Sequence, residues 1–188
     1  MKSLFWMLVA VLLAACSILP KPGTPPALHD FGPATNTPAA GVVPAEATVN
    51  APAWLDGSAI YYRLLYDDPT QLRAYADNRW LAPPAQLLQA RLRGAFANGS
   101  SHYRLRVQLL EFEQIFDTAQ SAHVSLRAVA ELQSLASGAT VAQHLFAVSV
   151  PASPDVQGAV SGGARAADEM LAQLVQWTQA QLAGARRK

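Results

Sequence analysis

The sequence predicts an α+β fold, a two-layer sandwich in which helices cover one face of a mainly antiparallel sheet. Three consecutive segments, starting near residues 103, 122 and 140, alternate apolar and polar residues, which is the pattern of half-buried strands. Two longer segments, 83–99 and 157–182, carry apolar residues at helical spacing. Because the predicted order is β-β-α-β-β-β-α, a sheet with its helices on one face is the economical packing.

The first fifteen residues predict a signal peptide. Lys2 supplies a positive charge, and an uninterrupted apolar stretch, 4–15, follows it. That stretch is shorter than the roughly 20 residues that a membrane-spanning helix needs. The sequence Leu13-Ala14-Ala15-Cys16 resembles the lipobox of bacterial lipoproteins, which implies cleavage between Ala15 and Cys16 and a lipid on the Cys16 thiol. The alternative, a signal anchor with an incidental cysteine, is disfavoured because length, flank and small-residue spacing agree.

The position of the cysteine also bears on where the protein resides. Cys16 is the single cysteine of the chain, so no intramolecular disulfide can form, and lipid attachment explains its presence. Two or more acyl chains hold a protein stably on a membrane. In enteric bacteria an Asp after the cysteine retains a lipoprotein at the inner membrane, so Ser17 implies sorting to the outer membrane. We therefore expect a lipid-anchored protein of the outer membrane that faces the periplasm.

The region after the cysteine divides into a tether and a domain. Residues 16–41 are rich in proline and alanine and predict an extended tether. A short island at 28–33 interrupts the tether and predicts a brief edge strand. The folded domain is expected over 42–184, and the basic residues at 185–188 are expected to be a frayed end.

Two strands and a helix are predicted in the first half of the domain. The strands are expected at 42–49 and 60–66, the second being rich in aromatic residues. Residues 70–82 follow neither period and predict an irregular or short-helical connection. Pro83-Pro84 opens the helix, since proline is tolerated in the first helical turn, and Asn98-Gly99 closes it.

The second half predicts three strands and the long final helix. The alternation of the first strand slips near residue 110, which predicts a bulge. In the second strand, 122–133, the even-numbered residues should face the core, with Leu126 near the centre. Ser137-Gly138 predicts a turn into the third strand, 140–150, and the helix at 157–182 completes the domain.

Charge and motif content disfavour several classes of function. Lys2 is one of 14 basic residues, so removal of the signal peptide leaves 13 basic against 13 acidic residues. A neutral chain lacks the basic surface of a nucleic-acid-binding protein. The four histidines do not pair at metal-ligand spacing, and no nucleophile motif occurs. We therefore expect no enzyme activity, no metal and no cofactor.

Aromatic and arginine side chains in and after the second strand offer a candidate contact surface. Tryptophan, tyrosine and arginine most often carry the binding energy of protein interfaces. This selects Tyr62, Arg79 and Trp80 as candidate partner contacts, the last two standing just before the rigid helix start. Packing in the core and turns is the favoured interpretation of the aromatic group, and the sequence leaves both open.

Beyond the lipobox, the mature chain carries a series of short motifs. They are Asp30-Phe31-Gly32-Pro33, Trp54-Leu55-Asp56, Ile60-Tyr61-Tyr62-Arg63, Tyr75 with Arg79-Trp80-Leu81-Ala82-Pro83-Pro84, Tyr103-Arg104-Leu105, Leu110-Glu111-Phe112, Phe146 and an alanine-rich final helix ending near Trp177. Their order and spacing resemble the ABC-type transport auxiliary lipoprotein component family, which includes the Pqi-type lipoprotein partners of MCE intermembrane lipid transporters. The resemblance covers nearly the whole mature chain.

The resemblance implies a non-enzymatic periplasmic domain anchored on the outer membrane. Such a domain would dock an MCE-domain protein and, through it, act with an inner-membrane permease and ATPase. The cargo would be phospholipid or a related hydrophobic molecule, and no catalytic residue carries over. The alternative is a carrier that itself holds lipid between sheet and helices, which would require an apolar cavity. Assembly into a homo-oligomer stays open.

Overall fold

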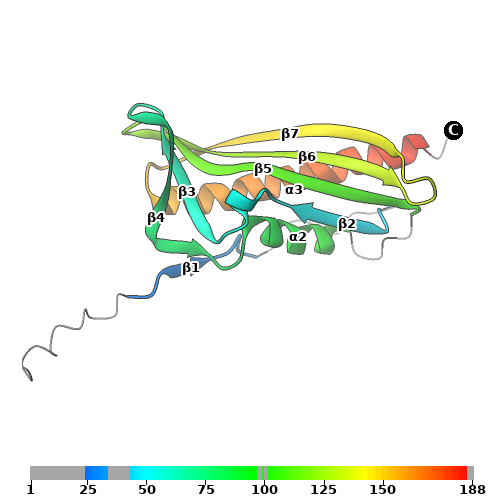
Figure 1. The fold of residues 1–188 in the computed structure, drawn as a ribbon, viewed down its shortest axis with the longest axis horizontal. Coiled ribbons are helices and arrows are strands. Elements are labelled where there is room, and N and C mark those ends of the chain that lie inside the picture. The colour runs from blue at the N-terminus through cyan, green and yellow to red at the C-terminus, as the bar shows by residue number, and fades with distance from the viewer. Residues whose placement is uncertain (1–23, 34–42, 97–98, 100, 186–188) are drawn as a thin grey trace, which may run out of the picture.

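The structure, a computed structural model, describes residues 24–33, 43–96, 99 and 101–185. They form a seven-stranded sheet with two helices packed on one face (Figure 1), which confirms the predicted α+β class. The strands are β1 (Ala27–His29), β2 (Glu46–Asn50), β3 (Ala59–Leu64), β4 (Asp68–Trp80), β5 (Tyr103–Thr118), β6 (Ser121–Ser134) and β7 (Thr140–Ala152), and the helices are α2 (Pro84–Ala95) and α3 (Val156–Ala185).

The sheet is mixed, whereas the sequence predicted a mainly antiparallel one. Its order is β1-β4-β3-β5-β6-β7, with β2 beside β5. The β3–β4, β5–β6 and β6–β7 pairs are antiparallel, and the β1–β4, β2–β5 and β3–β5 pairs are parallel. One edge of β5 serves two partners in succession, because β2 pairs with residues 104–108 and β3 with residues 114–116.

The β5–β6–β7 part of the sheet follows the predicted alternation. Leu126, Ala128 and Ala130 of β6 are at most 1% exposed and face the helices, as the even-numbered positions should. The register of β5 against β6 shifts between Leu109 and Glu111, which confirms the predicted bulge. Because the bulge adds a residue, the buried face of β5 changes there from odd to even positions.

The prediction of an irregular or short-helical connection at 70–82 is wrong, because residues 68–80 form the 13-residue strand β4. β4 pairs with β3 on one side and with β1 on the other. Most of its residues are exposed or half-buried, so its sequence shows little of the apolar alternation on which strand prediction depends. Pairing with its neighbours, more than burial, keeps this strand extended.

Helix α3 covers the strands β5–β7 along much of their length, and α2 packs beside it against β2 (Figure 1). The first half of α3 approaches the sheet closely because it carries small residues. A Cβ atom on Gly162 would lie 2.7 Å from Cγ2 of Val124, and one on Gly163 would lie 2.9 Å from Cη2 of Trp80. These glycines therefore allow the close packing of α3 on the sheet.

The island predicted at 28–33 contributes the edge strand β1 and a core residue. Leu28 pairs with Arg79 in parallel register, and Phe31, 5% exposed, contacts the rings of Trp80 and Phe112. The folded part thus includes a segment of the predicted tether. The predicted signal peptide 1–15, the candidate lipid site Cys16 and residues 186–188 of the predicted tail 185–188 lie outside the described residues, whereas residue 185 still belongs to α3.

Candidate functional site

Trp80, one of the candidate partner contacts, lies in the core. Its side chain is 3% exposed, its ring stacks on Phe112 at 5.5 Å between centroids, and it meets the edge of Phe31 at 5.3 Å. Gly163 of α3 leaves the space that the indole fills. The interpretation of Trp80 as a surface contact is therefore wrong, and the core interpretation is confirmed.

Arg79 precedes Trp80 in β4 but is not buried with it, and Tyr62 lies away from both. Arg79 is half-buried, and its guanidinium donates hydrogen bonds to the backbone oxygens of Tyr75 and Asn78, the second at 2.9 Å. Tyr62 lies further along the β3–β4 hairpin, opposite Arg73 in register. The structure does not gather the three residues into one surface.

Tyr62 lies where the β3–β4 hairpin turns, and we call residues 62–73 the hairpin end. The centroid of the Tyr62 ring lies 4.7 Å from that of Tyr75 and 5.9 Å from that of Phe116. Tyr75 donates a 2.6 Å hydrogen bond to the buried amide of Gln114, which in turn donates to the backbone oxygen of Ser153 at 2.7 Å. Burial, together with the nearby Tyr62, raises the pKa of Tyr75, so its hydroxyl remains protonated.

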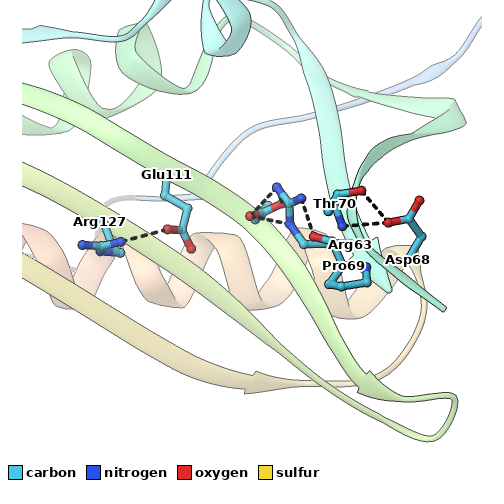
Figure 2. A network of polar contacts seen from close by, with 7 residues as sticks. Arg63, Asp68, Pro69, Thr70, Glu111 and Arg127 are labelled. Atoms are coloured by element: carbon cyan, nitrogen blue, oxygen red, sulfur yellow. Dashed lines mark hydrogen bonds and ion pairs between the residues drawn. The ribbon is translucent and has the colours of Figure 1, made fainter. Parts of the chain in front are cut away.

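An ion pair on the helix-free face of the sheet links the hairpin end to the neighbouring strand (Figure 2). Arg63 of β3 donates two 3.2 Å hydrogen bonds to Glu113 of β5 and a 3.0 Å bond to the backbone oxygen of Pro69. Thr70 closes the neighbouring turn by donating to Asp68 through its backbone N–H at 2.9 Å and its hydroxyl at 2.6 Å. The hydrogen bonds from Thr70 lower the pKa of Asp68.

Glu113 is a buried carboxylate, with its side chain 5% exposed. Burial raises its pKa, and the hydrogen bonds and charge of Arg63 act in the opposite direction. Its geometry is that of a clamp between strands, since every described hydrogen bond to it comes from the guanidinium of Arg63. The sequence analysis missed this pair, although an arginine within the aromatic run 60–66 was a signal of a buried partner.

The tip of the hairpin end presents two large apolar side chains to solvent. Leu65 is 43% and Tyr66 is 52% exposed. The backbone beneath them is fixed, because Leu65 N donates to Phe116 O at 3.0 Å and Asp67 N donates to Leu64 O at 3.3 Å. The sequence placed both residues within the strand 60–66, but β3 ends at Leu64 and they belong to the turn. An apolar tip on a rigid support has the properties of a protein contact.

Three of the four histidines in the described part of the chain make local side-chain contacts. His29 bonds Asn78 at 2.8 Å, His123 bonds Asp117 at 3.0 Å, and the His144 ring stacks on Trp177. No group of three or more potential metal ligands occurs among the described residues. Over the same residues, no helix is both long enough and apolar enough to cross a membrane.

The space between the helices and the sheet is almost filled. An apolar cavity of about 10 Å³ is lined by Leu88 and Leu92 of α2, Met170, Leu171 and Leu174 of α3, and Val49, Val107 and Ala128 of the sheet. A second space of about 10 Å³ lies around Ile60, Trp80 and Phe112. Pockets that hold small molecules commonly measure roughly 300–1,000 Å³.

A family model matches most of the chain and so identifies the family to which the protein belongs. The family model described as the ABC-type transport auxiliary lipoprotein component matches residues 32–176. The chain belongs to this family. The family description associates the protein with an ABC transporter as an auxiliary component, in accord with the resemblance noted in the motifs.

Solved structures share the fold of this auxiliary lipoprotein at low sequence identity. A Xanthomonas campestris protein assigned to the DUF330 family model is 20% identical with a TM-score of 0.69, over 88% of this chain and 97% of that chain. An uncharacterized protein is 16% identical with a TM-score of 0.61, over 81% of this chain and 98% of that chain. No curated protein matches the auxiliary lipoprotein.

Proposed function

We propose that this auxiliary lipoprotein is held on the outer membrane by lipid on Cys16 and docks the MCE-domain protein of an intermembrane lipid transport system. In this role it connects the outer membrane with the permease and ATPase of the inner membrane. The family match supports the transport role, and the lipobox Leu13-Ala14-Ala15-Cys16 supports the anchor.

The observation that carries the docking role is the hairpin end. Leu65 and Tyr66 are exposed on a turn whose support is fixed by the Arg63–Glu113 and Tyr75–Gln114 contacts. The tip also lies at the opposite end of β4 from β1, the strand nearest the anchor in sequence. Thirteen residues at roughly 3.3 Å each give β4 a contour length of roughly 40 Å, and the strand bends between the tip and β1 (Figure 1).

The docking role is tested by capture of the MCE-domain protein from crosslinked cells. Tyr66→Ala should weaken capture roughly thirtyfold, which corresponds to the loss of about 2 kcal/mol that an interface anchor commonly carries. Leu135→Ala is the matched control, because Leu135 is 41% exposed in the turn after β6. Equal capture of the two variants would remove the hairpin end from the interface. Failure of the wild-type protein to capture an MCE-domain protein would refute the proposed partner.

The anchor is tested by Cys16→Ala. The variant should remain unprocessed or become soluble, and it should take up no acyl label, because Cys16 is the only cysteine. Fractionation of membranes after labelling with a radioactive fatty acid measures both properties. Normal labelling of the variant would contradict the lipobox interpretation, and fractionation with the inner membrane would contradict the outer-membrane location.

The alternative function, a carrier that encloses lipid, is disfavoured by the packing. The apolar space between helices and sheet holds about 10 Å³, far less than an acyl chain needs. A larger hollow of about 300 Å³ on the helix-free face is lined largely by polar residues, among them Arg106, Gln108 and Glu131. Mass spectrometry of the purified protein distinguishes the two functions, since a carrier would retain phospholipid in addition to the lipid attached to Cys16.

A further inference from the structure

The segment that leads from the tether into the domain is fastened firmly to it. Leu81 N donates to the backbone oxygen of His29 at 2.6 Å, which continues the β1–β4 ladder. Nη2 of Arg91 on α2 donates to the backbone oxygens of Phe31 and Gly32 at 2.7 and 2.8 Å, and Nη1 lies 3.2 Å from Asp168 of α3. The point at which the tether leaves the domain is therefore fixed in orientation.

The tether that precedes this segment is short. Cys16 and Ala27 are eleven residues apart. A flexible chain of that length has a typical end-to-end distance of about 18 Å, and a fully extended polyproline-like chain reaches about 34 Å. If Cys16 carries lipid, as the proposed function requires, β1 and the end of β4 are the parts of the domain held nearest to that membrane.

The surface at this end carries the two most exposed large apolar side chains among the described residues. Leu28 of β1 is 60% exposed, and Leu81, which follows β4, is 58% exposed. They are close in register, because Leu28 pairs with Arg79, two residues before Leu81. Charges of both signs flank them, with Asp30 and Asp77 exposed and Arg79 half-buried, so attraction to an anionic surface does not account for the site.

We propose that Leu28 and Leu81 insert into the headgroup region of the bilayer that holds the Cys16 lipid and seat the domain on it with the β1 end toward the membrane. The occupant of this surface is a lipid interface, and zwitterionic phospholipid is sufficient. The proposal rests on the lipid anchor. Because the short tether makes the contact intramolecular, two leucines are enough, although they would not hold an untethered domain on a membrane.

The test uses the full lipidated protein in phosphatidylcholine vesicles that contain a spin-labelled quencher lipid. Cys16 is blocked by its lipid, so a new cysteine is the only thiol that an environment-sensitive dye can label. Ala27→Cys places the dye on exposed β1, and Leu135→Cys places it in the turn after β6 as the control. Quenching should be several-fold greater for the dye at position 27 than for the dye at position 135.

The contribution of the leucines is tested in the Ala27→Cys protein by adding Leu28→Ser and Leu81→Ser. Both side chains are exposed, so the melting temperature should stay close to that of the parent, while quenching should fall several-fold, leaving only the quenching that comes from the short tether. Unchanged quenching in this variant would overturn the proposal, as would equal quenching at positions 27 and 135 in protein that floats with the vesicles. If the purified wild-type protein carries no lipid on Cys16, the anchor itself is refuted, and with it the premise of this proposal.

Discussion

The two faces of the sheet are built by the same strands, yet they are stabilised in different ways. On the face covered by α2 and α3, side chains such as Leu126 are fully buried and the space is nearly filled. The other face carries cross-strand ion pairs, among them Arg63–Glu113 and Arg127–Glu111. The comparison teaches that apolar packing holds the helices to the sheet, and that polar contacts fix how the β3–β4 hairpin joins β5.

The largest expected effect comes from a charge on the covered face. Leu126→Asp should destabilise the fold by about 4 kcal/mol or more, because Leu126 is 0% exposed and the new carboxylate would lack a partner. Arg127→Asp, one residue away on the open face, replaces an exposed 3.5 Å ion pair with a repulsion between carboxylates in solvent, and it should lower the stability by only about 1 kcal/mol. Urea denaturation measures both, and equal losses would contradict the assigned faces.

Two tryptophans provide a second contrast between buried and exposed positions. Trp80→Ala should lower the free energy of unfolding by about 3–5 kcal/mol, since it empties the space between Phe112 and Gly163. Trp54→Ala should cost about 1 kcal/mol, because Trp54 is 47% exposed. Thermal unfolding of the two variants is the measurement. Similar melting temperatures would show that the Trp80 ring is not part of the core.

An intermediate effect is expected from the ion pair on the open face. Arg63→Met leaves the Glu113 carboxylate buried without its partner, which should cost about 2–3 kcal/mol. This figure lies below that of a fully buried pair because the Arg63 side chain is 22% exposed. Adding Glu113→Leu should restore most of the loss, and a double-mutant cycle in urea measures the coupling. Additive losses would exclude the clamp.

The smallest effect is a dependence of stability on pH. Burial raises the pKa of Glu113 in the folded protein, so the folded state binds this proton more tightly than the unfolded chain does. The contribution of Glu113 to stability is therefore greatest below its unfolded pKa and is lost as the pH rises through its folded pKa. Relative to Glu113→Gln, the wild-type protein should gain stability as the pH falls from 7 to 4. A constant or opposite difference would contradict the raised pKa.

The covered face was largely predictable from sequence, because its strands alternate and its final helix has a continuous apolar stripe. Strand β4 was not predictable in the same way. Residues 68–80 are mostly exposed or half-buried and owe their extended form to β3 and β1, contacts that no local pattern reports. The mixed character of the sheet follows from the same long-range pairings.

The candidate site was predictable only in part. An aromatic residue beside an arginine and two prolines is compatible with burial in the core or with a surface contact. Trp80 is buried because it packs against Phe31 and Gly163, which are both distant in sequence. Leu65 and Tyr66 were hidden in an apolar run that continues past the end of β3. Whether such a run ends in the sheet or in the turn depends on its register with β5.

The shared edge of β5 has a consequence for how the protein folds. The strands β5–β7 form consecutive hairpins whose contacts are local in sequence. By contrast, β2 and β3 pair with β5, which follows them in the chain, and Glu46 contacts Arg104, 58 residues further on. Local hairpins form early and distant pairings close late. A chain that emerges from its N-terminus therefore leaves β2 and one edge of β3 without a partner until β5 has followed, although β3 can already pair with β4. Unpaired strand edges are prone to aggregation, so this interval is the one in which the chain is most exposed to it.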